Sequence, residues 1–384
     1  MNETPSPARM ERAEVAPPLA LLAEVTHRCP LRCPYCSNPL ELDRASRELP
    51  TAAWTRILGE AAALGVLQVH FSGGEPMARR DIVDLVAHAT RAGLYTNLIT
   101  SGVLLDHAKM AALAAAGLNH VQLSFQDSEG GNADRIAGLD GAHGKKLAAA
   151  ALVREAGLPL TLNAVMHRQN LDHLPATIDL AVRLGAQRLE VAHVQYYGWA
   201  VPNRRALFPT YEALERATAI VDVARERLKG VLTIDYVVPD YYARRPKACM
   251  GGWARQFINV SPAGKALPCH AAETLPGFDW PSLTTTSLSD AWYRSDAFNR
   301  YRGIAWMPEP CLSCDRREID WGGCRCQAFA FTGDASRTDP ACALAPDRSI
   351  LDAARADALG PATDFVYRQI GAAPSGGIDV SERI

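Results

Sequence analysis

The sequence predicts an α/β fold, namely a partial (β/α)6 barrel of the TIM type followed by a smaller cysteine-rich C-terminal domain. Short β-rich runs alternate with longer helical patterns from residue 18 to about 230, and repeated βα units imply a parallel sheet with helices outside it. Six units are recognisable, fewer than the eight of a closed barrel. All ten cysteines fall in two blocks, 29–36 and 249–342, which indicates two separate functional regions.

The strands and helices are expected in strict alternation. The six predicted strands are Leu19–Val25, Val66–Phe71, Tyr95–Ile99, His120–Phe125, Leu158–Val165 and Arg188–Val194. Amphipathic stretches between them predict helices over Thr51–Leu64, Asp81–Arg91, Leu147–Glu155 and Leu174–Leu184. Functional groups in such sheets sit on the loops that follow the carboxyl ends of the strands.

The remaining parts of the chain complete a four-part organisation. Residues 1–17 carry charges and prolines without an apolar stretch, which favours a flexible leader over a signal peptide. The barrel is expected over 18–235, the cysteine-rich domain over 236–345, and a tail without assigned chemistry over 346–384. The first strand and the leader are a candidate dock for an extended peptide, by strand addition.

Bulk properties narrow the class of protein. The 384 residues carry a net charge of -2, which provides no electrostatic reason to expect a nucleic acid or an anionic membrane as partner. No apolar run is long enough to span a bilayer. The cysteines stand in motif spacings and not as a disulfide framework, which favours metal ligation.

The first cysteine block is Cys29-x3-Cys33-x2-Cys36, directly after the first predicted strand. A [4Fe–4S] cluster held by three cysteines has one open iron, and an open position admits a substrate or cofactor. The alternatives are a zinc knuckle or a purely structural cluster. One βα unit later comes Ser72-Gly-Gly-Glu-Pro76, in which two glycines allow close backbone approach to a ligand. Alone, this second motif is typical of a turn.

Together, the two motifs resemble those of radical S-adenosylmethionine (SAM) enzymes, with Tyr35 as the aromatic before the third cysteine. The resemblance implies that SAM chelates the open iron and is cleaved to methionine and a 5′-deoxyadenosyl radical. The implied cofactor-binding residues are Tyr35, Gly73, Gly74, Glu75, Ser124, Arg135 and Asn163. Glu75 could instead only hold its loop together, Ser124 and Arg135 could be ordinary surface residues, and Asn163 could be a loop anchor.

The C-terminal cysteines resemble the SPASM domain of radical SAM maturases. Cys249-x14-Gly264-x4-Cys269 is followed by Cys311-x2-Cys314-x5-Asp320-x3-Cys324-x-Cys326 and then Cys342. The resemblance implies two auxiliary Fe–S clusters. The nearer one, [2Fe–2S] or [4Fe–4S], is assigned Cys249, Cys269, Cys324 and Cys326; the second, [4Fe–4S], is assigned Cys311, Cys314, Cys342 and Asp320.

Two alternatives stand beside this assignment. Asp320 occupies a position where the family has a cysteine, and it could be a solvated loop residue with no ligand role. A tetrahedral zinc site could use Cys311, Cys314, Cys324 and Cys326, but it assigns nothing to the other three C-terminal cysteines.

Two features resemble the PqqE family of pyrroloquinoline quinone biosynthesis. They are residues 190–205, with Tyr196-Tyr-Gly-Trp199 after the sixth strand, and the aspartate at Asp320 in place of the usual cysteine. That family joins a glutamate carbon to a tyrosine ring in the peptide PqqA, which the chaperone PqqD presents. The resemblance implies a flavodoxin-type reductant and a cytoplasmic location. Candidates for the catalytic base or for packing the ring are His193, Tyr196, Tyr197 and Trp199, although each could be an ordinary aromatic of the barrel mouth.

Two other functions remain open at this stage. Another SPASM maturase, such as an anaerobic sulfatase-maturing type, would oxidise one side chain without forming a carbon–carbon bond. A multi-cluster electron carrier would need no open iron, no glycine loop and no barrel, so the first two motifs argue against it.

Overall fold

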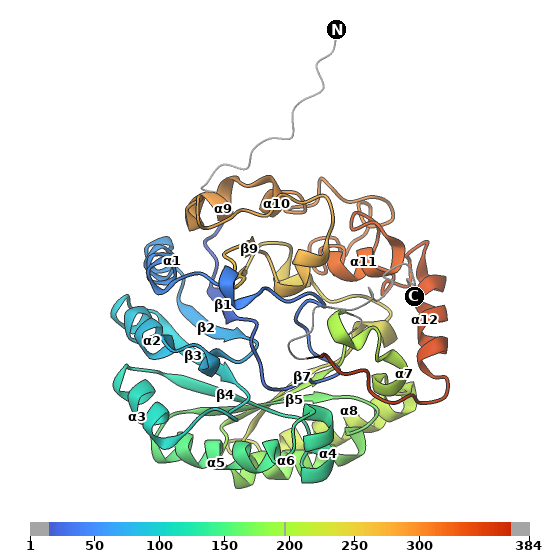
Figure 1. Cartoon of the computed structure of the whole chain (residues 1–384). Coiled ribbons are helices and arrows are strands. Elements are labelled where there is room, and N and C mark those ends of the chain that lie inside the picture. Colours follow the sequence, from blue (N-terminus) through green and yellow to red (C-terminus); the bar gives the residue numbers. More distant parts are fainter. Residues whose placement is uncertain (1–14, 196, 370–384) are drawn as a thin grey trace.

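A single sheet of nine strands organises the molecule, with helices around its outside (Figure 1). The structure is a computed structural model that describes residues 15–195 and 197–369. Residues 1–14 of the expected leader, Tyr196 and residues 370–384 of the tail lie outside the described residues. Among the described helices, none has the length and apolar character needed to cross a membrane.

The strand order is β7-β6-β5-β4-β3-β2-β1-β8-β9. The strands are β1 Ala20–Thr26, β2 Gln68–Gly73, β3 Tyr95–Thr100, β4 His120–Phe125, β5 Leu160–Met166, β6 Arg188–His193, β7 Thr233–Val237, β8 Phe257–Val260 and β9 Ala266–Leu267. All neighbouring pairs are parallel except β8 and β9, which are antiparallel. The structure thus confirms the predicted α/β class and partial barrel.

The helices lie outside the curved sheet. They are α1 Thr51–Leu64, α2 Ile82–Arg91, α3 His107–Ala115, α4 Gly130–Ala137, α5 Ala142–Glu155, α6 Leu174–Arg183, α7 Arg204–Leu207, α8 Tyr211–Arg227, α9 Leu288–Arg294, α10 Asp296–Asn299, α11 Arg325–Thr332 and α12 Arg348–Ala358. The prediction for α1 has the same bounds, whereas α3, α4 and α8 were not predicted. Helix α4 begins with two glycines, which have poor helix propensity, and the Glu129 side chain caps it by accepting from the backbone N–H groups of Gly131 and Asn132.

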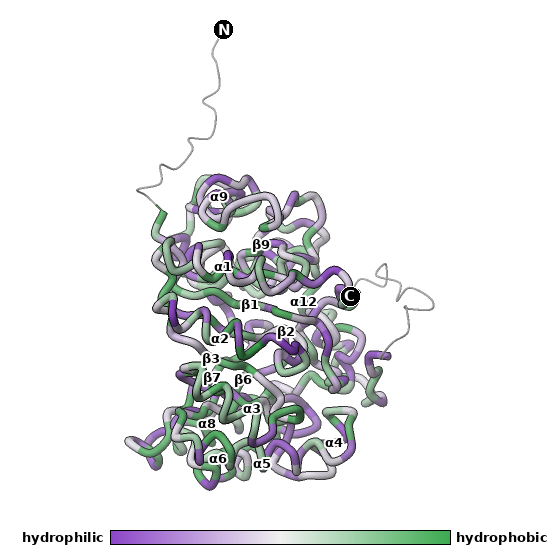
Figure 2. Tube along the Cα trace, turned by 60° about the vertical axis from the view of Figure 1, so that its left-hand side comes forward, coloured by the Kyte–Doolittle hydropathy of each residue, from purple (hydrophilic) through white to green (hydrophobic). Residues whose placement is uncertain are grey.

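The core lies between the sheet and the helices. Strand β1 is buried along nearly its whole length, as expected for a parallel strand that is covered on both faces. Figure 2 shows hydrophobic residues along the central strands. Helix α1 contributes Trp54 and Ile57, whose side chains are fully buried.

The sheet continues beyond the six predicted strands on both sides. Strand β7 adds a seventh parallel strand next to β6, and β8, from the region predicted as the second domain, pairs with β1. Both strands are short, which made them hard to recognise in the sequence. Residue Ala20 pairs with Gln68 on one side and Phe257 on the other. The suggested peptide dock on β1 is therefore wrong, because neither edge of this strand is free.

Candidate functional site

A cavity of about 320 Å³ opens at the carboxyl ends of the parallel strands, beside the loop that carries the first three cysteines. Its wall includes most of the predicted cofactor and catalytic residues, namely Tyr35, Gly73, Gly74, Ser124, Asn163, His193 and Tyr197, together with the thiols of Cys29, Cys33 and Cys36. The elements that bring them together are the ends of β2, β4, β5 and β6 and the loop after β1. Glu75, Arg135 and Trp199 are not part of this wall.

The three thiols have the donor chemistry that a [4Fe–4S] cluster with an open iron requires. Burial raises the pKa of Cys29 to about 12 and that of Cys33 to about 11, so both thiols hold their protons at neutral pH until a metal displaces them. Among the described residues, no three histidine, cysteine or acidic side chains gather closely enough for a single metal ion.

The glycine loop packs directly against the backbone that leads into the cysteine loop. Gly73 has a φ of 115°, and a Cβ placed there would lie 2.3 Å from the carbonyl oxygen of Thr26. A Cβ on Gly74 would lie 2.5 Å from the carbonyl oxygen of Arg28. The Gly74 N–H donates to the Thr26 carbonyl at 2.6 Å. Only glycine fits at these two positions, and the resulting groove brings bare backbone to the cavity wall.

Glu75 is fully buried and lies behind this loop. Its carboxylate accepts hydrogen bonds from the Thr100 hydroxyl at 2.6 Å, the Ser101 N–H at 2.8 Å, the Met77 N–H at 3.0 Å and the Ser101 hydroxyl. With four donors, the carboxylate ties the glycine loop to the end of β3. This arrangement favours the loop-holding alternative for Glu75 over direct contact with a cofactor.

Ser124 and Asn163 face each other across the pairing of β4 and β5. Both line the cavity, and the Asn163 amide donates to Glu190 at 2.8 Å, which orients it. Arg135 lies instead on the outer helix α4, where its guanidinium donates to Asn132 at 2.7 Å and stacks 4.7 Å from the ring centroid of Phe365. The structure therefore separates Arg135 from the cavity that holds the other predicted residues.

His193 ends β6 and forms part of the cavity wall. Its Nε2 lies 3.1 Å from the Tyr236 hydroxyl, and its Nδ1 has no partner among the described residues. Burial lowers the pKa of His193 to about 4, so the imidazole is neutral at pH 7. Tyr197 lies on the same wall with its ring 5.7 Å from that of His270, and burial raises the pKa of its hydroxyl above the ordinary value.

The turn Gly198–Ala200 supports the cysteine loop through its backbone. The Trp199 N–H donates to the Cys36 carbonyl at 3.0 Å. Gly198 has a φ of 57°, and a Cβ there would lie 2.6 Å from the same carbonyl oxygen. The structure therefore gives Trp199 a supporting position, while its neighbour Tyr196 lies outside the described residues.

The seven C-terminal cysteines form two groups. In the first, the neighbouring thiols of Cys249 and Cys326 lower the pKa of Cys324, and the neighbouring thiols of Cys269 and Cys324 raise the pKa of Cys326. The second group, formed by Cys311, Cys314 and Cys342, lines one small cavity with Asp320. The two groups have the same members as the two ligand sets that the resemblance to the SPASM domain implies, whereas the zinc alternative combines cysteines from both groups.

Asp320 is buried, with 8% of its surface exposed, so it is not a solvated loop residue. Its carboxylate accepts from the Gly322 N–H at 3.2 Å and from the Arg316 guanidinium at 3.3 Å. Each oxygen thus has one protein donor and further lone pairs toward the cavity that the second cysteine group lines. This geometry is compatible with the predicted ligand role.

Three residues near the first cysteines were missed by sequence reasoning. The Gln126 amide lies 3.8 Å from the Cys33 sulfur. Lys146 is fully buried and donates to the Ser124 carbonyl at 2.8 Å, and burial lowers its pKa to about 8. The spacing of Lys146 from Ala149, Ala150 and Val153 places it on the apolar face of a helix, and this pattern indicates burial. Arg368, from the tail, had no such signal.

Comparisons with known proteins agree with one another. Residues 23–181 match the model of the Radical SAM superfamily. A relative from Granulibacter bethesdensis, named PqqA peptide cyclase, is 64% identical over 360 residues, which cover 94% of this chain and 96% of the relative. A relative of the same name from Rhodopseudomonas palustris is 63% identical over 354 residues, which cover 91% of this chain and 94% of that protein.

Solved structures share the fold at low sequence identity. Streptococcus suis SuiB bound to S-adenosylmethionine aligns with a TM-score of 0.72 and 21% identity, covering 87% of this chain and 79% of that one. SuiB bound to its precursor peptide SuiA aligns with a TM-score of 0.69 and 21% identity over 85% of this chain and 76% of that one. Native anSMEcpe with bound AdoMet aligns with a TM-score of 0.58 and 16% identity over 89% and 98% of the two chains.

Proposed function

The chain belongs to the radical SAM superfamily and, within it, to the PqqA peptide cyclases of pyrroloquinoline quinone biosynthesis, and we propose that it joins a glutamate and a tyrosine side chain of PqqA. In this reaction a carbon–carbon bond forms between the glutamate γ-carbon and the tyrosine ring, and one hydrogen leaves each partner. The substrate is therefore oxidised by two electrons.

One observation carries the proposal. The three cysteines, the bare backbone of Gly73 and Gly74, and polar groups of three further strands line a single cavity at the mouth of the barrel. When bound, the three-cysteine cluster and SAM supply a 5′-deoxyadenosyl radical, which can take a hydrogen atom from an unactivated carbon.

The residues of this chain then have three tasks. Cys29, Cys33 and Cys36 would hold the cluster. Ser124 and Asn163, which line the same cavity, would orient SAM by hydrogen bonds. Their third task is to surround the bound groups, because SAM and substrate would displace water from the cavity between the ends of the strands and the loop after β1. Exclusion of water protects a radical from side reactions.

Completion of the reaction releases one proton and one electron from the tyrosine ring. His193 is the neutral base on the cavity wall, so it is the side chain best able to receive that proton. Its pKa of about 4 makes it a weak base, which suffices for a strongly acidic ring intermediate. An auxiliary Fe–S cluster would supply an acceptor for the electron. It would be held by Cys249, Cys269, Cys324 and Cys326.

The partners follow from the same proposal. PqqA is the substrate peptide, PqqD presents it, and a flavodoxin-type protein supplies electrons to the cluster at Cys29, Cys33 and Cys36. Cys311, Cys314, Cys342 and Asp320 would hold the second auxiliary cluster. This group lines its own small cavity, which shares no lining residue with the cavity at the barrel mouth.

The test is an anaerobic reaction of reconstituted protein with SAM, a strong reductant, PqqA and PqqD, with the product analysed by tandem mass spectrometry. We expect a loss of two hydrogens and fragments that link one glutamate to one tyrosine. Deuterium at the glutamate γ-carbon should appear in 5′-deoxyadenosine. Oxidation of one side chain without a link would assign the chain to side-chain-oxidising maturases instead. Absence of SAM cleavage by fully loaded protein would contradict the proposal altogether.

A further inference from the structure

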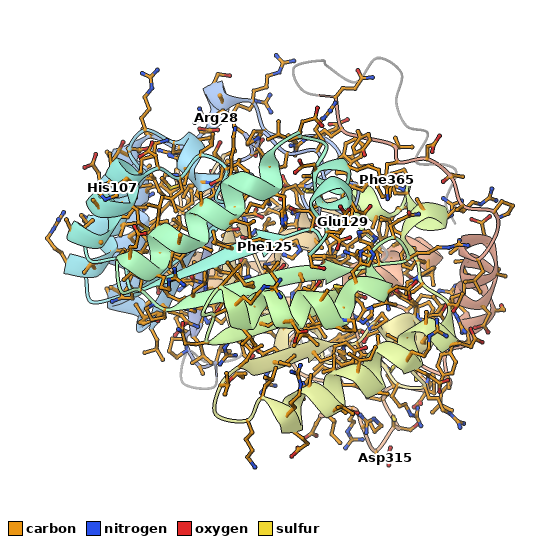
Figure 3. The ribbon with its side chains drawn as sticks, turned by 90° about the horizontal axis from the view of Figure 1, so that it is seen from below. Arg28, His107, Phe125, Glu129, Asp315 and Phe365 are labelled. Atoms are coloured by element: carbon orange, nitrogen blue, oxygen red, sulfur yellow. The ribbon has the colours of Figure 1, made fainter. Side chains whose placement is uncertain are left out.

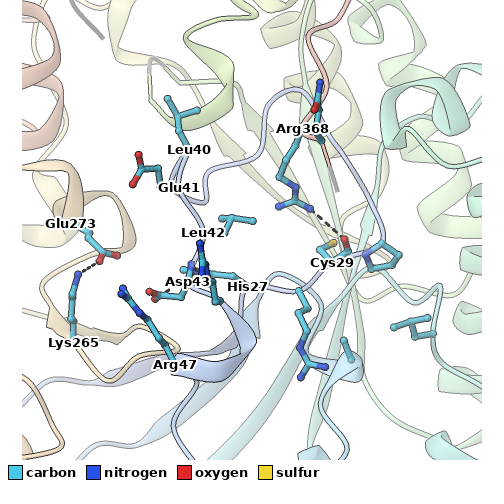
Figure 4. Close-up of a pocket in the computed structure, with 16 residues that line it drawn as sticks. His27, Cys29, Leu40, Glu41, Leu42, Asp43, Arg47, Lys265, Glu273 and Arg368 are labelled. Carbon is cyan, nitrogen blue, oxygen red and sulfur yellow. Dashed lines mark hydrogen bonds and ion pairs between the residues drawn. The ribbon is translucent and has the colours of Figure 1, made fainter. Parts of the chain in front are cut away.

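A second, larger cavity of about 1160 Å³ adjoins the first at the barrel mouth (Figure 4). Its wall combines the loop after β1, the region of Lys265 and Glu273, and the tail of the chain. Cys29 and Arg368 line both cavities. The two spaces therefore meet at these residues, and a ligand in the larger one can reach the first cysteines there.

The wall of the larger cavity carries more cationic than acidic side chains. Its wall includes the cationic residues Arg28, Arg44, Arg47, Lys265 and Arg368 and the acidic residues Glu41, Asp43 and Glu273. Lys265 pairs with Glu273 at 2.5 Å, and Arg28 pairs with Glu48 at 3.2 Å. Arg44 and Arg47 have no acidic partner among the described residues. Unpaired cations at a cavity attract carboxylates.

The tail is fixed where it enters this region. After α12 it runs back past α7 to the middle of the barrel (Figure 1). The Val366 N–H donates to the Asn203 side chain at 2.7 Å, and that side chain donates in turn to the Val366 and Pro34 carbonyls. Asn203 is completely buried, so it joins the tail to the cysteine loop in a defined register.

Two aromatic side chains of the tail fix the segment that leads to Arg368. Phe365 lies against the Arg135 guanidinium, and Figure 3 shows Phe365 beside the helix that begins after Glu129. The Tyr367 hydroxyl donates to the Arg135 carbonyl at 2.5 Å, and the Arg32 guanidinium lies 5.4 Å from the Tyr367 ring centroid. These contacts leave the next residue, Arg368, directed toward the barrel mouth.

Arg368 is buried, with 9% of its surface exposed, and its charge is only partly compensated. Its Nη2 donates to the Leu31 carbonyl at 2.7 Å and to the Cys29 carbonyl at 3.4 Å. Its Nη1 has no partner, and no acidic side chain pairs with it, among the described residues. Burial of an arginine with an unsatisfied donor is costly unless a ligand completes its hydrogen bonds.

We propose that Arg368 binds the side-chain carboxylate of the substrate glutamate at the junction of the two cavities. The inference rests on the proposed function, in which the hydrogen atom leaves the glutamate γ-carbon. Because this carbon is bonded directly to the carboxylate carbon, a fixed carboxylate fixes the reacting carbon as well. The peptide occupies the larger cavity, and its glutamate reaches past Cys29 into the smaller one.

A double-mutant cycle of binding affinities tests this assignment without turnover. The binding of fluorescently labelled PqqA, and of PqqA with glutamine at the target glutamate, is measured for reconstituted wild-type protein and the Arg368→Gln variant. We expect Arg368→Gln to weaken binding of PqqA about tenfold and to leave binding of the glutamine peptide nearly unchanged. Arg368→Lys should restore part of the loss, because it keeps the charge without the planar fork.

Arg32→Gln is the matched control. Arg32 also holds the cysteine loop, through two hydrogen bonds to the Gly138 carbonyl, and it contacts the tail, but it lines neither cavity. If both variants lose iron and bind both peptides equally less well, Arg368 only anchors the loop and the proposal is wrong. If Arg368→Gln instead raises the Kd of SAM and leaves peptide binding unchanged, the ligand of Arg368 is the SAM carboxylate. That outcome also overturns the proposal.

The binding cycle separates this inference from the proposed function. A glutamate-dependent loss of affinity in Arg368→Gln, without a cross-linked product from the wild type, would support carboxylate recognition and contradict the reaction. A cross-linked product from the wild type, without glutamate dependence in the cycle, would support the reaction and contradict the role of Arg368.

Discussion

The Glu75 carboxylate is the residue-scale feature that holds the glycine loop in place. Its four hydrogen-bond donors come from the loop itself and from the end of β3. Glu75→Ala leaves these donors without an acceptor inside the protein, so we expect a loss of about 3–5 kcal/mol in the free energy of unfolding. Anaerobic denaturant titration of the reconstituted protein measures this loss.

The matched control for Glu75 is Asp106→Ala. Asp106 also accepts a hydrogen bond from a backbone N–H, that of Lys109 at 2.8 Å, but it is exposed at the start of α3. Water can replace it there, so its removal should cost much less. Equal losses in the two variants would show that the buried network of Glu75 adds nothing to the stability of the loop.

Asp320 is predicted to be an Fe–S ligand of the second C-terminal group. We expect Asp320→Ala to change the electron paramagnetic resonance spectrum of that cluster and to lower its iron occupancy by roughly a quarter or more, since one of four ligands is lost. The spectrum of the cluster at Cys29 should stay unchanged.

Glu318→Ala provides the comparison for Asp320, because Glu318 is a nearby acidic residue with a largely exposed side chain. It should leave all spectra and the iron content as in the wild type. If Asp320→Ala behaves like Glu318→Ala, Asp320 only accepts the hydrogen bonds of Gly322 and Arg316.

At the scale of elements, the turn at Gly198 supports the cysteine loop by close backbone contact. A Cβ at Gly198 would overlap the Cys36 carbonyl, at 2.6 Å. We expect Gly198→Ala to cost about 1–3 kcal/mol beyond the backbone penalty and to lower the iron content of the first cluster. Iron analysis and denaturant titration after identical reconstitution measure both effects.

Gly93→Ala isolates the backbone penalty. Gly93 also has a positive φ, of 86°, but a Cβ there has no neighbour within 4 Å. Its substitution should cost about 1–2 kcal/mol for the left-handed backbone alone and leave the iron content unchanged. An iron loss in Gly93→Ala as large as that in Gly198→Ala would refute the role of the close contact.

The elements differ in how well their sequence patterns predicted them. Strand β1 was recognisable as a nearly continuous apolar run. Strands β4 and β6 were recognisable because apolar and polar residues alternate along them. Helix α4 was missed because Gly130 and Gly131 disfavour a helix, and its cap and its packing decide the conformation. Strand β8 was missed because four residues are too few for a periodic pattern, and pairing with β1 stabilises it.

At the scale of the whole molecule, Glu24 on β1 and Asn259 on β8 join the barrel to the C-terminal region. The Asn259 amide donates to the Glu24 carboxylate at 3.1 Å, and both residues are buried. Burial is the main cause that raises the pKa of Glu24 to about 7. The folded protein therefore favours protonated Glu24. The free energy of unfolding falls as the pH rises from about 4.5 through about 7, because Glu24 loses its proton more readily in the unfolded chain.

Glu24→Gln should remove this pH dependence, since glutamine is always neutral and keeps an oxygen for Asn259. Relative to the wild type, we expect the variant to gain about 2–3 kcal/mol of stability between about pH 5 and about pH 8.5. Denaturant titrations at both pH values test this, with Glu212→Gln on the exposed side of α8 as control. A gain that is the same at both pH values would contradict the raised pKa of Glu24.

The sequence by itself determined the fold class and the three-cysteine motif, because local spacing and periodicity carry this information. Only the tertiary structure decided which residues reach the cavity. It placed Arg135 on an outer helix, turned Glu75 into a buried anchor and brought Arg368 from the end of the chain to Cys29. These placements depend on pairings between residues far apart in the chain, and no local pattern encodes such pairings.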